Sequence, residues 1–149
     1  MLKETIEILE LNIKRARSDY HEIKSWEKLT PSFFNNDNER RVIDSFIFRF
    51  IKIQDLMGEK LFREVLSSLG EYKRNMSFID VLDKMEQLGI LNSADQWNDY
   101  RELRNELFHE YPTNEDEIIK DITLAVTAFE DIENIFLNIK KYLKDKKSI

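Results

Sequence analysis

Glycine and proline are scarce in this chain, with three glycines and two prolines among its 149 residues. Folds rich in β-strands need many tight turns and usually contain more of both residues. The few breakers here separate long segments in which apolar residues recur at spacings of three and four, the period of a helix that buries one face. The sequence therefore predicts an all-α protein: a single domain over residues 1–149, built as an up-and-down bundle of four to five helices.

The breakers and the periodic segments set the limits of five predicted helices. We expect helices from about Leu2 to Lys24, from Asp37 past Gly58 to Leu69, from Ser77 to Leu88, from Ser93 to just before Pro112, and from near Asn114 to about Lys144. Asn36, Ser77 and Ser93 are expected to cap their helices, because such side chains accept hydrogen bonds from free N–H groups of the first turn. The second segment is apolar around most of its circumference, which predicts the central, most buried helix.

Several classes of site are excluded by what the sequence lacks. The chain has no cysteine, so disulfides, iron–sulfur clusters and thiolate zinc sites are ruled out. No glycine-rich loop of the phosphate-binding kind is present, and His21 has no second histidine or paired acid at metal-ligand spacing, so we interpret it as a surface residue. We expect neither a cofactor nor a metal.

Hydropathy and charge indicate the environment in which the chain works. No run approaches the roughly 18 apolar residues of a membrane helix, and the first residues lack an apolar run of signal-peptide length, so we expect a cytoplasmic protein that is not membrane-bound. Lys and Arg number 23 and Asp and Glu number 29, a formal net charge of −6. A net acidic protein does not attract nucleic acid through its overall field. If the chain handles RNA, the positive charge must be local.

The fourth predicted helix combines an apolar stripe with unusual polar residues. In projection at about 100° per residue the stripe contains Trp97, Tyr100, Leu103, Leu107 and Phe108. Arg104 falls inside this stripe, whereas Asn105 and His109 are four residues apart and share the neighbouring face. A guanidinium within an apolar stripe needs an anionic partner or a position at the edge of the bundle. The residue types alone leave open whether Arg104 meets a carboxylate of another helix, extends to solvent, or meets an anionic ligand.

The spacing of these polar residues points to a known family. Arg104 is followed after four residues by His109, and Tyr111 lies two positions further on. This pattern resembles the R-x-x-x-x-H-x-Y motif of HepT-like toxins in the HEPN superfamily, in which a polar residue such as Asn105 commonly follows the arginine. The motif also lies where that family has it, at the end of the penultimate long helix. The resemblance covers most of the chain in helix order and Leu103–Tyr111 in residues.

The resemblance implies a metal-independent ribonuclease in which the ribose 2′-hydroxyl attacks the adjacent phosphate. His109 suits general acid–base catalysis, because the usual pKa of histidine lies near neutrality. Arg104 suits the charge that develops on the phosphate, and Asn105 would position the phosphate or orient the imidazole. One motif histidine per chain cannot act on both sides of the scissile bond. The family solution is a homodimer in which two such helix ends share one cleft.

Tyr111 carries the regulatory part of the resemblance. In HepT-like toxins the matching tyrosine accepts AMP from a cognate minimal nucleotidyltransferase antitoxin, which would make Tyr111 the residue at which the ribonuclease is neutralised. Without the family, Tyr111 would be expected only to pack against the turn before Pro112. Two other functions stay open: a non-catalytic subunit that binds the nucleotidyltransferase or presents substrate to it, and a purely structural bundle. The acidic net charge favours the non-catalytic subunit over the ribonuclease, whereas the complete set of motif residues favours the ribonuclease.

Overall fold

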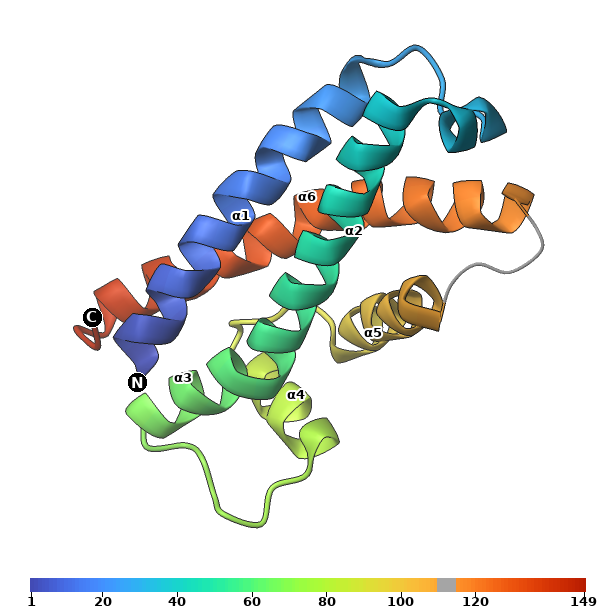
Figure 1. Ribbon diagram of the computed structural model, residues 1–149. Coiled ribbons are helices and arrows are strands. Elements are labelled where there is room, and N and C mark those ends of the chain that lie inside the picture. The colour runs from blue at the N-terminus through green and yellow to red at the C-terminus, as the bar shows by residue number, and fades with distance from the viewer. Residues whose placement is uncertain (110–114) are drawn as a thin grey trace.

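The computed structural model describes residues 1–109 and 115–149, and the regular structure in those two ranges is entirely helical (Figure 1). The elements are α1 (Leu2–Ser25), the 3₁₀ helix η1 (Pro31–Asn35), α2 (Asp37–Leu56), the π-helical segment η2 (Met57–Leu61), α3 (Phe62–Ser68), α4 (Phe78–Gln87), α5 (Ala94–His109) and α6 (Glu115–Asp145). The predicted all-α bundle is confirmed. None of the helices in the described ranges is long and apolar enough to cross a lipid bilayer.

Helix α2 is the centre of the bundle. It runs antiparallel to α1, and α5 and α6 pack against it as well (Figure 1). Its apolar residues at spacings of three and four are buried, among them Ile43, Phe46, Phe50 and Ile53. The ring of Phe46 meets that of Phe129 on α6 edge to face, with 5.8 Å between the ring centroids. The predicted central position of this helix is confirmed, but α2 is not the most buried helix, because α6 buries a larger share of its residues.

The helix that begins at Asp37 continues past Gly58, but not as a regular α-helix. Met57–Leu61 form one π-helical turn, after which the helix continues as α3. A Cβ atom at Gly58 would lie 3.3 Å from Nε1 of Trp97 and 3.6 Å from the ring of Phe78. Gly58 is therefore a packing glycine that lets α5 and α4 approach this turn closely. Such π-turns are frequent at functional sites, and this one borders the candidate site.

The predicted helix caps are confirmed, since in each case a side-chain oxygen accepts a hydrogen bond from the backbone N–H three residues on. The pairs are Asn36 with Glu39 (2.9 Å), Ser77 with Asp80 (3.1 Å) and Ser93 with Gln96 (3.1 Å). The 3₁₀ helix η1 was not predicted and lies within the first expected break. Asn114, near which the last helix was expected to begin, lies outside the described residues, as does Pro112.

Candidate functional site

Helix α5 packs against α2 and α6 through a narrower apolar stripe than the sequence predicts. Trp97, Leu103 and Leu107 are buried as expected. Phe108 was assigned to the same stripe, but 59% of its surface is exposed. In projection Phe108 lies only about 20° from the buried Trp97, so its angular position does not explain the exposure; it lies about three turns further along, in the last turn of α5. The assignment of Phe108 to the buried stripe was therefore wrong.

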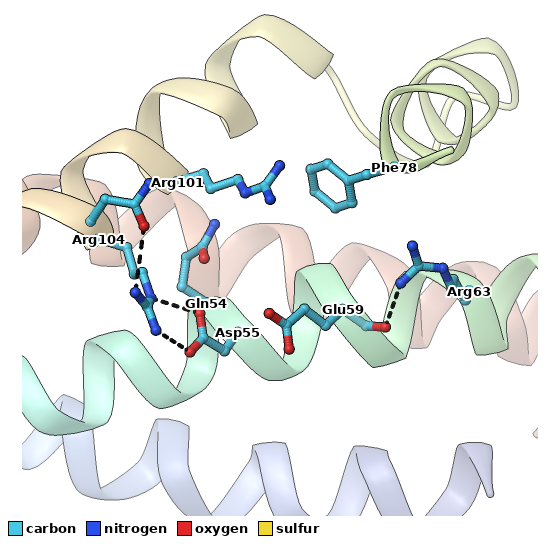
Figure 2. A pocket seen from close by; sticks show the side chains of 8 residues that line it. Gln54, Asp55, Glu59, Arg63, Phe78, Arg101 and Arg104 are labelled. Atoms are coloured by element: carbon cyan, nitrogen blue, oxygen red, sulfur yellow. Dashed lines mark hydrogen bonds and ion pairs between the residues drawn. The ribbon is translucent and has the colours of Figure 1, made fainter. Parts of the chain in front are cut away.

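The partner of Arg104 is a carboxylate on another helix. Its Nε donates to Oδ1 of Asp55 at 2.8 Å and its Nη2 donates to Oδ2 at 2.7 Å, as Figure 2 shows. The two side chains are 21% and 31% exposed. The hydrogen bond with Asp55 raises the pKa of Arg104, against a smaller opposing effect of burial. One of the alternatives that the sequence left open is thereby settled: α2 supplies the anion that makes this guanidinium acceptable beside the core.

The other two motif residues of the described chain lie on the exposed side of α5. Oδ1 of Asn105 accepts a hydrogen bond from Nη1 of Arg104 at 3.4 Å. Asn105 and His109 are both exposed, one helical turn apart. The His109 ring meets the Phe108 ring edge to face, with 5.6 Å between centroids, and the Arg104 guanidinium lies 4.9 Å from the centroid of that same ring. Helical spacing brings these residues together as predicted. Tyr111, the predicted modification site, lies outside the described residues.

A cavity of about 280 Å³ opens beside Arg104, between α5, the π-turn and the start of α4. It is lined by Gln54, Asp55, Glu59, Arg63, Phe78, Arg101, Arg104 and Asn105. Figure 2 shows the Arg101 side chain extended toward Phe78, and the guanidinium carbon lies 4.4 Å from the centroid of that ring. Sequence reasoning identified only Arg104 and Asn105 among these residues. Arg101 and Asn105 are four residues apart and therefore share one face of α5. This spacing is the local signal from which Arg101 could have been predicted to lie beside Asn105.

Gln54 is the most unusual residue in this cavity. Only 3% of its surface is exposed, and its Nε2 has no hydrogen-bond partner among the described residues. Figure 2 shows its amide extending from α2 toward Arg101. A buried donor without a partner costs about 1–3 kcal/mol of folding free energy. Because this nitrogen is itself buried, an acceptor in the cavity would reach it only after the side chain moves.

A second polar contact joins α5 to α6 on another face. Burial, the nearby charge of Glu106 and a hydrogen bond with that side chain raise the pKa of Asp121 to about 6. Further along, the hydroxyl of Tyr100 donates to Oδ2 of Asp131 at 2.5 Å. Burial and the hydrogen bond with Asp131 raise the pKa of Tyr100. Sequence reasoning predicted neither pair, because both depend on how α6 lies against α5.

In the described ranges, no group of three or more histidine and carboxylate side chains is placed to hold a metal ion. His21, interpreted as a surface residue, is exposed. No protein-family model matches the chain, and no curated protein or solved structure is significantly similar to it. The function is therefore inferred from the motif residues and their geometry.

Proposed function

We propose that the protein is a HEPN-type ribonuclease toxin of a HepT and minimal-nucleotidyltransferase toxin–antitoxin pair, which cleaves RNA without a metal ion. The observation that carries the proposal is the arrangement at the end of α5. An oriented guanidinium, an exposed amide and an exposed imidazole lie within two helical turns, at Arg104, Asn105 and His109. These are the groups that phosphate binding and proton transfer require.

The pairing with Asp55 fixes how Arg104 would meet a phosphate. The edge of the guanidinium formed by Nε and Nη2 is occupied by the carboxylate, which leaves Nη1, on the side of Asn105. A guanidinium held in this way loses little side-chain entropy when it binds an anion. In the proposed mechanism, Nη1 and the Asn105 amide bind a non-bridging oxygen of the scissile phosphate.

The reaction needs two proton transfers. A base takes the proton of the 2′-hydroxyl while its oxygen attacks phosphorus, and an acid protonates the 5′-oxygen as its bond to phosphorus breaks. The products are a 2′,3′-cyclic phosphate and a 5′-hydroxyl. One His109 would serve one side of the scissile bond. We therefore include a homodimer in the proposal, with His109 of a second copy on the other side.

Local positive charge supports an RNA substrate despite the net charge of −6. Arg63, Arg101 and Arg104 all line the cavity beside the motif. Asp55 offsets one of the three, so the cavity still contains more cationic than anionic side chains when Glu59 is counted. This is the local concentration of charge that an acidic RNA-binding protein needs.

Neutralisation by AMP transfer to Tyr111 completes the proposal. A cytoplasmic nucleotidyltransferase antitoxin would attach AMP two residues beyond His109. The added phosphate would compete with RNA for the cationic side chains.

A non-catalytic subunit that binds the nucleotidyltransferase is the second candidate. It is favoured by the fact that Asp55 already neutralises Arg104, as well as by the net acidity.

Cleavage of single-stranded RNA by the purified protein in the presence of a chelator tests the proposal. His21 is the other histidine of the chain and is exposed, so it provides a matched control. We expect the parent and His21→Ala to cleave equally, and His109→Ala to be slower by about 100-fold or more. A parent that does not cleave, yet forms a stable complex with the nucleotidyltransferase, would support the non-catalytic subunit instead.

A further inference from the structure

We propose that the cavity beside Arg104 binds a guanine base of single-stranded RNA and so selects where the chain is cut. The proposal rests on the ribonuclease function for the source of the base, but base binding itself stands on the cavity. Proteins that read single-stranded RNA place a splayed base in such a pocket, where it stacks on an aromatic or guanidinium plane and makes hydrogen bonds through its edges.

The cavity has the size and the stacking surface for one base. Its volume is about 280 Å³, just below the roughly 300–1,000 Å³ of small-molecule sites, which suits a single base. One face of the Arg101 guanidinium packs on Phe78 at 4.4 Å. The other face of a planar guanidinium supported in this way can stack on a base. The contact with Phe78 would reduce the entropy that Arg101 loses when a base is bound.

The polar groups of the cavity match the edges of guanine. Guanine presents two acceptors, O6 and N7, and two adjacent donors, N1–H and N2–H. With Arg101 stacked on the base, Arg63 supplies donors from the cavity wall. Glu59 supplies a carboxylate that no hydrogen bond or ion pair occupies within the described residues. Asp55 is not available, because Arg104 occupies both of its oxygens.

The single available carboxylate is what favours guanine over the other bases. A carboxylate accepts two hydrogen bonds side by side, and guanine has two adjacent donors on its Watson–Crick edge, whereas adenine, cytosine and uracil each have one donor group there. A bare phosphate fits less well, because it would face the negative charge of Glu59. The mixture of donors and one acceptor thus indicates a base rather than an anion.

The site is adjacent to the proposed chemistry. Arg104 and Asn105 line the cavity and belong to the motif, and His109 follows one turn further along α5. A guanine held here would place a neighbouring phosphate of the same strand near His109. The consequence is a preference for cleavage next to guanine.

Binding by a non-cleaving variant gives a direct test. His109→Ala is titrated with fluorescent hexanucleotides of uridine that contain one guanosine, one adenosine, one inosine or none, and with inorganic phosphate as competitor. We expect the guanosine oligomer to bind at least ~10-fold more tightly than the adenosine and all-uridine oligomers. The inosine oligomer, which lacks the N2 amino group, should fall between, and phosphate should compete weakly.

A matched pair of variants assigns the preference to the cavity. Glu59→Gln in the same background should bring the guanosine oligomer to within about 2-fold of the adenosine oligomer. Glu102→Gln, at an exposed position on α5 outside the cavity, should leave the preference unchanged. Equal binding of all oligomers, or strong competition by phosphate alone, would overturn the base-binding proposal.

The same experiments separate this proposal from the ribonuclease assignment. Guanosine-selective binding by a protein whose parent never cleaves would retain the cavity assignment and reject the ribonuclease. Cleavage that depends on His109 but shows no base preference would retain the ribonuclease and reject the guanine site.

Discussion

Arg104 on α5 and Asp55 on α2 form a bidentate ion pair, with both carboxylate oxygens bound at 2.8 and 2.7 Å. Either single substitution leaves a partly buried charge unpaired. We expect Asp55→Asn and Arg104→Gln each to lower the free energy of unfolding by about 1–3 kcal/mol. The loss of stability in the double variant should be smaller than the sum of the two single losses. We expect a difference of about 0.5–3 kcal/mol in a double-mutant cycle measured by urea unfolding.

Glu10 and Lys140 provide the control for that cycle, because they form a more exposed ion pair at 3.0 Å. Glu10→Gln should change stability by no more than about 1 kcal/mol, as solvent screens such pairs. Additive losses at Asp55 and Arg104 would mean that the bidentate pair contributes nothing of its own to stability.

Gly58→Ala tests the close packing at the π-turn. Alanine ordinarily stabilises a helix relative to glycine by up to about 1 kcal/mol. Here the new methyl group would lie 3.3 Å from Nε1 of Trp97, which is fully buried and packs against Phe62. Because this indole is enclosed by its neighbours, we expect a net loss of about 1–3 kcal/mol in thermal or urea unfolding. A variant more stable than the parent would show that the turn has room.

Asp121 predicts a specific dependence of stability on pH. Its pKa is raised from 3.8 to about 6 in the folded state, so between these values the folded protein retains a proton that the unfolded chain releases. The contribution of Asp121 to the free energy of unfolding is therefore greatest at low pH. It falls as the pH rises toward 6 and stays low above that value. Asp121→Asn should stabilise the protein at pH 7 by on the order of 1 kcal/mol, after allowance for solvent screening.

Unfolding at two pH values checks this prediction. Near pH 3.5, where the unfolded chain is also mostly protonated, Asp121→Asn should have little advantage over the parent. Asp83→Asn, which replaces an exposed carboxylate on α4, is the control. Its effect on the free energy of unfolding should differ less between the two pH values. An equal gain from Asp121→Asn at both pH values would contradict the assignment of the shift to this residue.

Tyr100→Phe removes one hydroxyl from the contact between α5 and α6. The hydroxyl donates to the carboxylate of Asp131 at 2.5 Å, so its loss should cost about 1.5–3 kcal/mol, the range for hydrogen bonds to charged groups. The ring packs beside Trp97 in both variants, at 6.2 Å between centroids in the parent. Chemical denaturation measures the change, and Tyr100→Phe combined with Asp131→Asn should lose less than the two separate effects added.

Tyr111→Phe addresses the proposed regulation. The substitution removes the oxygen that would accept AMP and retains the ring, so we expect RNA cleavage to persist while neutralisation by the nucleotidyltransferase is lost. Mass spectrometry of the co-expressed parent should find an AMP increment on Tyr111. An increment on another residue, or a fully silenced protein with none, would refute this part of the proposal.

Local interactions explain what the sequence by itself determined. The limits of the helices follow from capping side chains such as Asn36, Ser77 and Ser93, each of which bonds within three residues of itself. The burial of α2 follows from its own apolar pattern. The clustering of Arg104, Asn105 and His109 at one end of α5 follows from helical period alone.

Only the tertiary structure decided what surrounds that cluster. Asp55 lies 49 residues before Arg104, and their contact depends on the packing of α2 against α5. The burial of the Gln54 amide depends on how α2 packs near the π-turn, and the exposure of Phe108 depends on how far along α5 the core extends. The physical reason is that periodicity fixes which residues share a face of one helix, whereas the rotation and spacing between helices result from packing many side chains at once.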